Sequence, residues 1–186
     1  MILYIHGFGS SAFSTKAKLL KQYFGEENIL IPSLPYIPNL AVDTLEQIIK
    51  IFPNINLIGA SLGGYYSIYL ADKYNLKSVV INPTINPHLT LKQAVPQGIS
   101  YYDNSRYDFK ESYLNELENM RVKNPNLEKS YLFVQGGDEV LDSKESLKYF
   151  KGGNILFEKG GNHGFENFET KIDIIDKFFN GIQGRS

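Results

Sequence analysis

The 186-residue chain has no cysteine, which excludes disulfide bonds, thiolate metal sites and a cysteine nucleophile. It has no excess of charge either. Its 19 basic and 20 acidic residues give a net charge of −1, so nothing favours nucleic acid or a membrane surface as a partner. No apolar run reaches the roughly 20 residues of a membrane span, and the apolar start at residues 2–5 is too short for a signal peptide. These absences favour a cytoplasmic protein.

Short apolar runs alternate with amphipathic segments along the chain, and 42% of the residues are hydrophobic, enough for the core of a single domain at residues 1–186. This alternation is typical of right-handed βαβ units, so we expect an α/β fold with a mostly parallel sheet of about six strands and helices on both faces. The strands are predicted at residues 2–5, 29–31, 55–58, 78–81, 131–134 and 155–157, and the main helices at 14–24, 42–52, 62–74, 143–150 and 168–179.

The one long interruption of this pattern spans residues 84–126. It is rich in proline and tyrosine and contains a short helical pattern at residues 110–121. A structureless loop of that length is improbable inside a compact domain. We therefore predict an inserted lid with one or two short helices.

The predicted strand at residues 55–58 runs directly into Gly59-Ala60-Ser61-Leu62-Gly63, and an apolar helix follows. This is the G-x-S-x-G pattern in its strand–turn–helix context, where the serine hydroxyl projects from a sharp turn above the sheet. Glycine fits both flanking places, because side chains there would collide with the neighbouring backbone. The pattern predicts Ser61 as the nucleophile of an α/β-hydrolase fold, rather than as a helix cap in a chance glycine-rich turn.

The loop after the first strand, His6-Gly7-Phe8-Gly9, is where this fold provides an oxyanion-hole donor. We expect the N–H groups of Phe8 and Leu62 to form that hole. Gly7-x-Gly9-x-x-Ala12 also matches a dinucleotide-binding fingerprint. The second strand, however, ends at Ile31-Pro32 without the acidic residue that would bind a ribose, which counts against nucleotide binding.

Histidine is scarce, with His6, His88 and His163 as its three occurrences. His163 lies in a glycine-containing loop after the predicted last strand, the position of the catalytic base in the Ser–acid–His order of this fold. We expect His6 to support the oxyanion loop by hydrogen bonds, and His88 to be solvated or near the substrate. The scattered histidines and the absence of H-E-x-x-H predict no metal, and no cofactor is needed.

The orienting acid is expected just past the penultimate strand, where Gly137-Asp138-Glu139-Val140-Leu141-Asp142 follows. Asp138 is the preferred candidate because it comes first after the strand and its glycine turn. Glu139 and Asp142 are its rivals. Asp142 also fits as the N-cap of the next helix, with Glu145 completing a capping box.

Together these blocks resemble the YqiA-like esterases, a family of small bacterial α/β-hydrolases, over almost the whole chain. The matching pieces are His6-Gly7-Phe8, Ser10-Ser11, Lys16-Ala17, Ile31-Pro32-x-Leu34-Pro35, Ser61-Leu62-Gly63-Gly64-Tyr65-Tyr66, Asn82-Pro83, Gly137-Asp138-Glu139-Val140-Leu141-Asp142 and Gly160-Gly161-Asn162-His163 with Phe165. The resemblance implies esterase activity, with Ser61, Asp138 and His163 as the triad.

The residues and the resemblance lead to one expected activity. The protein is predicted to cleave carboxylic esters of small or medium acyl chains through an acyl-enzyme on Ser61, with a small-molecule ester or thioester as its partner. An acyl thioesterase is the close alternative, because the same groups cleave thioesters. A non-catalytic binding module of the same fold is the alternative from another class, although folding alone does not require serine, acid and histidine in this order.

Overall fold

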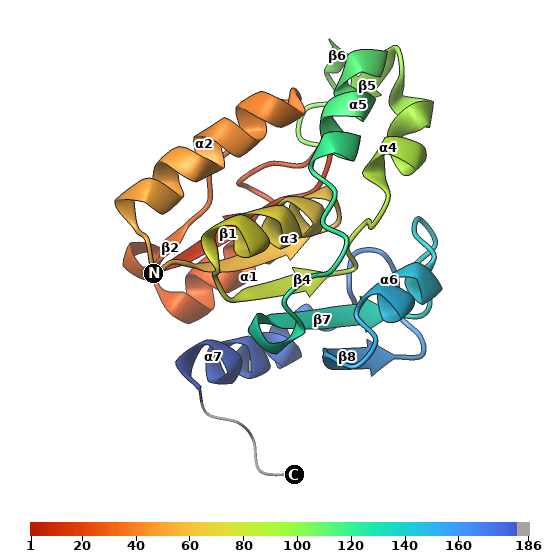
Figure 1. Cartoon of the computed structure of the whole chain (residues 1–186). Helices are drawn as coiled ribbons and strands as arrows, with labels where there is room; N and C mark the ends of the chain where they lie inside the picture. The colour runs from red at the N-terminus through yellow and green to blue at the C-terminus, as the bar shows by residue number, and fades with distance from the viewer. Residues whose placement is uncertain (182–186) are drawn as a thin grey trace.

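The computed structural model describes residues 1–181, and its centre is a parallel sheet of six strands in the order β2-β1-β3-β4-β7-β8 (Figure 1). Every neighbouring pair in this sheet is parallel. The strands are β1 (Ile2–Ile5), β2 (Ile29–Leu30), β3 (Asn56–Ala60), β4 (Ser78–Ile81), β7 (Ser130–Gln135) and β8 (Asn154–Glu158). The predicted fold class is confirmed, with each strand within two residues of its expected bounds.

Helices cover both faces of the sheet, because successive side chains of each strand point to opposite sides. In β1, Ile2 and Tyr4 pack into the core beneath one set of helices, whereas Leu3 and Ile5 pack into the core beneath the other. The first face carries α1 (Thr15–Phe24) and α7 (Ile172–Asn180), and the second carries α2 (Pro38–Ile51), α3 (Leu62–Tyr74) and α6 (Ser143–Tyr149). Single 3₁₀ turns occur at η1 (Glu26–Asn28), η3 (Leu127–Lys129) and η4 (Phe168–Lys171).

Helix α2 begins four residues earlier than its apolar stripe predicted. Pro38 occupies its first turn, where the missing N–H costs nothing and the fixed φ favours the helix. The stripe still identifies the buried side of the helix, since Val42, Leu45 and Ile49 all face the core.

Residues 84–126 fold into α4 (Pro87–Thr90), η2 (Leu91–Ala94), a two-stranded antiparallel hairpin of β5 (Gln97–Ile99) and β6 (Arg106–Asp108), and α5 (Glu111–Asn119). The helical pattern at residues 110–121 corresponds to α5, but the sequence analysis missed the hairpin. Phe109, Leu114 and Leu117 pack into the core under α2 and α3, and the Tyr65 hydroxyl donates a hydrogen bond to the Leu117 carbonyl. The segment is therefore anchored to the sheet domain by apolar burial.

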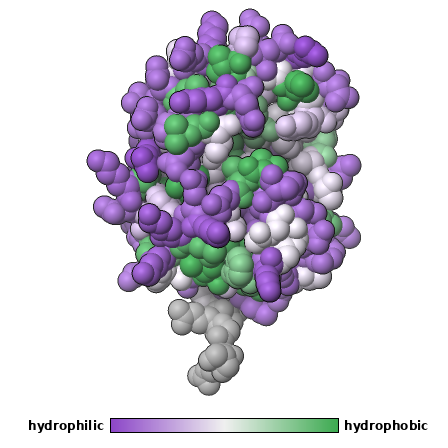
Figure 2. Space-filling model, turned by 90° about the vertical axis from the view of Figure 1, so that its right-hand side faces the viewer, coloured by the Kyte–Doolittle hydropathy of each residue, from purple (hydrophilic) through white to green (hydrophobic). Residues whose placement is uncertain are grey.

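Because the six strands are parallel, their carboxyl ends face the same edge of the sheet. In Figure 1 the arrows of β4, β7 and β8 point to the right, towards the side where α4 and the β5–β6 hairpin also lie. Figure 2 views the molecule from that side and shows hydrophobic side chains in separate patches among hydrophilic ones. Within residues 1–181, no helix has the length and apolar character needed to cross a bilayer. In open parallel sheets, ligands bind at the carboxyl edge of the strands, and the site residues predicted from the sequence lie at that edge.

Candidate active site

Ser61 lies in the turn between β3 and α3 with φ 54° and ψ −118°, a strained conformation for a residue with a side chain. The glycines on either side are required by close backbone packing. A Cβ on Gly63 would overlap the carbonyl oxygen of Ile5, and a Cβ on Gly59 would overlap that of Gly63. The turn therefore has the sharp geometry that the G-x-S-x-G pattern predicts, and it exposes Ser61 to a cavity.

A line of hydrogen bonds joins Ser61, His163 and Asp138 across the carboxyl edge of the sheet. Nε2 of His163 lies 3.2 Å from Oγ of Ser61, and Nδ1 lies 2.8 Å from Oδ2 of Asp138. A carboxylate can only accept, so Nδ1 donates to Asp138 and the neutral ring leaves Nε2 free to accept the hydroxyl proton. The structure thus brings together the three residues that the sequence predicted.

The side chain of Asp138 is buried, with 2% of it exposed, and within residues 1–181 every hydrogen-bond partner of its carboxylate is a donor. Besides His163, the backbone N–H groups of Val140 and Leu141 each donate to its Oδ1 at 2.9 Å. Burial by itself would raise the pKa of this carboxyl. The hydrogen bonds from His163, Leu141 and Val140 outweigh that effect, and the pKa lies below its ordinary value. Asp138 is therefore held as a carboxylate beside the imidazole.

The two rival acids have other contacts. Glu139 accepts a hydrogen bond from the backbone N–H of His163 at 2.9 Å, so it contacts the main chain of that loop. Asp142 is the N-cap of α6 and accepts from the N–H of Lys144 at 2.9 Å. The capping-box prediction is wrong in its second half, because Glu145 accepts from the side chain of Asn86.

The backbone N–H groups of Phe8 and Leu62 make no hydrogen bond within residues 1–181 and belong to residues that line the cavity with Ser61. Leu62 is the first residue of α3, so its N–H lies at the positive end of a helix. The Phe8 loop passes close to the serine, since a Cβ on Gly7 would lie 3.1 Å from Cβ of Ser61. The arrangement suits a developing negative charge on an oxygen bound between the two amides.

His6 and His88 lie outside the hydrogen-bonded line. His6 is buried, its Nδ1 donates to the Gly7 carbonyl and its Nε2 accepts from the Leu34 N–H, which agrees with the expected support of the loop. Burial lowers the pKa of His6, consistent with a neutral ring. His88 is half-buried, with Nε2 3.9 Å from Oε1 of Glu118, and is not among the residues that line the cavity. The expectation that it is solvated or near the substrate is wrong, because α5 covers it.

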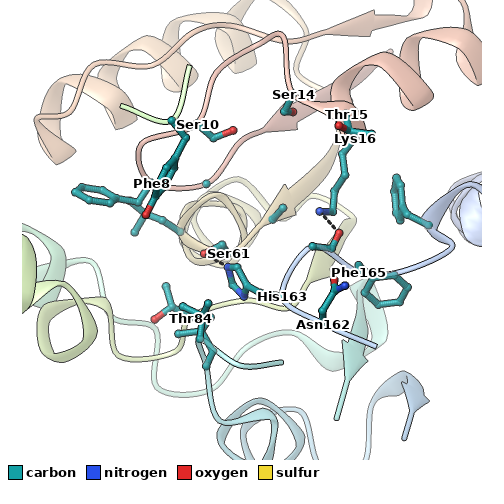
Figure 3. Close-up of a pocket in the computed structure, with 18 of the residues that line it drawn as sticks. Phe8, Ser10, Ser14, Thr15, Lys16, Ser61, Thr84, Asn162, His163 and Phe165 are labelled. Atoms are coloured by element: carbon teal, nitrogen blue, oxygen red, sulfur yellow. Dashed lines mark hydrogen bonds between the residues drawn. The ribbon is translucent and has the colours of Figure 1, made fainter. Parts of the chain in front are cut away.

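The cavity has a volume of about 1160 Å³ and lies between the inserted segment and the N-terminal end of α1. In Figure 3, Phe8 and Thr84 lie on one side of Ser61, and Lys16, Asn162 and Phe165 lie on the other, beyond His163. Leu91, Ala94 and Ile99 of the inserted segment line its apolar part. Residues 1–181 contain no group of three or more histidine, aspartate or glutamate side chains that could bind a metal ion together.

Three further polar side chains contact the loop that carries His163, and the sequence analysis assigned them no role in the site. Lys16 donates to the carbonyl of Gly164. Asn82 donates to the carbonyls of Asn162 and His163, and Gln135 accepts from the N–H of Asn162. Lys16 and Asn82 fall within the blocks that carry the family resemblance. Asn82 and Gln135 share another signal, a polar residue at the end of a strand, with Asn82 after β4 and Gln135 at the end of β7.

The parallel sheet, the sharp turn at Ser61 and the hydrogen-bonded line of Ser61, His163 and Asp138 together define a protein of the α/β-hydrolase fold class. Two solved structures agree in fold. Est1E from Butyrivibrio proteoclasticus with bound ferulic acid has a TM-score of 0.74 and 12% identity, and the match covers 97% of this chain and 88% of that one. Mouse alpha/beta hydrolase domain-containing protein 10 has a TM-score of 0.73 and 16% identity, and the match covers 98% of this chain and 90% of that one.

Within that class, the chain belongs to UPF0227, described as an uncharacterised protein family, whose model matches residues 1–180. One relative is the UPF0227 protein YcfP of Salmonella gallinarum, which is 24% identical over 191 residues that cover 96% of this chain and 98% of the relative. The family membership confirms the resemblance predicted from the motifs.

Proposed function

We propose that this protein is a serine esterase that cleaves carboxylic esters of small or medium acyl chains, with Ser61 as nucleophile, His163 as base and Asp138 as orienting acid. The observation that carries the proposal is the continuous hydrogen-bonded line from Ser61 Oγ through His163 to Asp138. The N–H groups of Phe8 and Leu62 beside the same cavity, which have no hydrogen-bond partner among the described residues, add the second requirement of acyl transfer, a site for the oxyanion.

The reaction has two halves. In the first, Oγ of Ser61 attacks the ester carbonyl while its proton moves to Nε2 of His163, and the amides of Phe8 and Leu62 bind the oxyanion. The intermediate collapses when the imidazolium returns that proton to the departing alkoxide, which leaves as an alcohol. In the second half, His163 takes a proton from water, hydroxide attacks the acyl-enzyme, and the proton returns to Ser61 as the acid leaves.

The cavity supports an ester of modest size as substrate. Its volume of about 1160 Å³ is ample for a small molecule, and the apolar side chains of the inserted segment are suited to an acyl chain. Ferulic acid, the ligand in the Est1E structure, is itself a carboxylic acid. We assign residues 84–126 the role of a lid that determines acyl preference.

The test is fluorophosphonate labelling together with a screen of paired oxygen esters and thioesters of the same acids. Labelling and hydrolysis should both disappear in Ser61→Ala. Ser67→Ala is the matched control, since Ser67 lies in α3, the helix that follows Ser61, and its buried hydroxyl has no hydrogen-bond partner in the described part of the chain. Unchanged hydrolysis in Ser61→Ala would falsify the proposal. Faster cleavage of thioesters than of oxygen esters would make the protein a thioesterase.

A further inference from the structure

The loop that carries His163 needs external support, because residues 159–167 belong to no helix or strand and include Gly160, Gly161 and Gly164. Such a backbone does not position an imidazole to within a fraction of an ångström by itself. Two side-chain amides beneath the loop are almost fully buried, with Asn82 2% exposed and Gln135 1% exposed. Asn82 forms hydrogen bonds to the main chain at Asn162 and His163, and Gln135 to the main chain on either side of His163.

Asn82 follows β4, the neighbour of the strand that leads into Ser61. Its Nδ2 donates to the carbonyl oxygens of Asn162 at 3.0 Å and His163 at 3.1 Å, and its Oδ1 accepts from the N–H of Gln135 at 3.0 Å. Asn82 has φ 40°, a left-handed conformation that asparagine tolerates better than most residues with a side chain. Its amide therefore ties the His163 carbonyl to the sheet.

Gln135 ends β7, the strand that leads into Asp138. Its Oε1 accepts from the N–H groups of Asn162 at 3.1 Å and Glu166 at 2.8 Å. Its Nε2 donates to the Glu166 carbonyl at 3.0 Å and to Oε2 of Glu158 at 2.6 Å. In each of these four hydrogen bonds a donor faces an acceptor, so the partners fix which way round the Gln135 amide lies.

We propose that Asn82 and Gln135 are positioning residues that hold the His163 imidazole between Ser61 and Asp138, a role that rests on the proposed esterase function. Hydrogen bonds between buried groups are strong because water does not compete for them. Those that flank His163 arise from the ends of two sheet strands, so they place the imidazole relative to the same sheet that positions the nucleophile and the acid. Neither amide is among the residues that line the cavity.

A positioning role and a purely structural role have different kinetic consequences. A misplaced imidazole is a poorer base towards Ser61 and a poorer acid towards the leaving group. Esters with an alkyl alcohol leaving group suffer most, because an alkoxide needs the proton from His163, whereas p-nitrophenolate leaves without it. Simple partial unfolding lowers the number of active molecules and reduces both rates by the same factor.

The experiment compares Asn82→Gly and Gln135→Met with wild type on the p-nitrophenyl and ethyl esters of one acid. Glycine retains the positive φ of residue 82, and methionine retains the length of the buried glutamine. The active fraction is counted with a fluorophosphonate, so that kcat is expressed per labelled site. Ser130→Ala is the control, because Ser130 is buried in β7 at the far end of the strand and the one hydrogen bond of its hydroxyl among the described residues is with the hydroxyl of Ser78.

We expect kcat per labelled site to fall about 100-fold on the p-nitrophenyl ester, the size of effect that a 1 Å misplacement produces. The fall on the ethyl ester should be at least tenfold greater, with KM changed less than threefold on both. The Ser130→Ala control should match wild type. Equal falls on the two esters, or kcat per site within threefold of wild type, would overturn the positioning role. A wild type that cleaves neither ester overturns the proposed function instead, and the positioning role with it.

Discussion

Replacing Asp138 by asparagine should abolish turnover while leaving the fold intact. Asparagine still offers an oxygen to the N–H groups of Val140 and Leu141, which donate to Oδ1 in the native protein. Its NH₂ group, however, faces Nδ1 of His163, so Nδ1 must become an acceptor and the ring proton moves to Nε2. That proton then points at Ser61, and the imidazole can no longer take the hydroxyl proton.

The expected loss in turnover is about 10⁴-fold, the size of effect seen when the triad aspartate of another serine hydrolase becomes asparagine. This corresponds to about 5 kcal/mol of transition-state stabilisation. The contrast is Asp142→Asn, four residues further on, where asparagine caps α6 as well as aspartate does. Losing the charge at that helix end should cost at most about 1 kcal/mol, a shift of roughly 2–4 °C in Tm, with turnover unchanged.

Ester hydrolysis and calorimetric Tm, measured on both variants, decide the assignment. A pH series adds an independent check. The pKa of Asp138 is lowered in the native state, so the stability that its charge contributes is complete above the unfolded-state pKa of about 3.9 and is lost as the pH falls below it. Asp138→Asn should lack that acid-side loss. The reasoning is refuted if Asp142→Asn is inactive and Asp138→Asn turns over within tenfold of wild type.

Other expected outcomes follow from single contacts. His163→Ala should lower turnover by several orders of magnitude, whereas His6→Ala should lower Tm more and turnover less. Since burial lowers the pKa of His6, the stability that its neutral ring contributes should be complete above pH 6.5 and decline below it. Calorimetry over a pH series should find that decline missing in His6→Ala. Tyr101→Ala should change the ranking of acyl chain lengths in an ester panel because Tyr101 lines the cavity, and Tyr102→Ala, whose ring contacts Phe13, should not. Gly63→Ala should yield no folded, labelled protein, because its Cβ would overlap the Ile5 carbonyl; a normal Tm would contradict this.

The parts of the fold that the sequence predicted well depend on local patterns. The sheet strands contain short apolar runs, and α7 places Ile172, Ile175 and Phe179 on one buried side. The G-x-S-x-G turn is also local, since its glycines, its serine and the following helix are consecutive in the chain. Local signals of this kind predict both the element and its place at the sheet edge.

The hairpin of β5 and β6 was missed because its stability comes from elsewhere in the chain. Its strands have three residues each, with one buried residue between them, Gly98. Tyr107 stacks on Tyr36, with ring centroids 3.3 Å apart, and the Tyr101 N–H donates to the Gly9 carbonyl. A short hairpin is marginal alone, so contacts with distant segments such as these fix it, and no local pattern reports them.

The strand order explains why Asn82 is placed to support the loop that carries His163. Ser61 follows β3 and Asp138 follows β7, and β4 lies between these strands. Neighbouring strands are about 4.8 Å apart, so the serine and the acid emerge roughly 10 Å from each other, too far for direct contact. The imidazole of His163 spans that gap with one hydrogen bond at each end, from a loop that follows β8, still further along the sheet. The end of the intervening strand is the natural place from which to support the loop, and that is where Asn82 lies. The need for an amide there becomes evident only once the strand order is known, because nothing in the sequence around Asn82 specifies which loop lies above it.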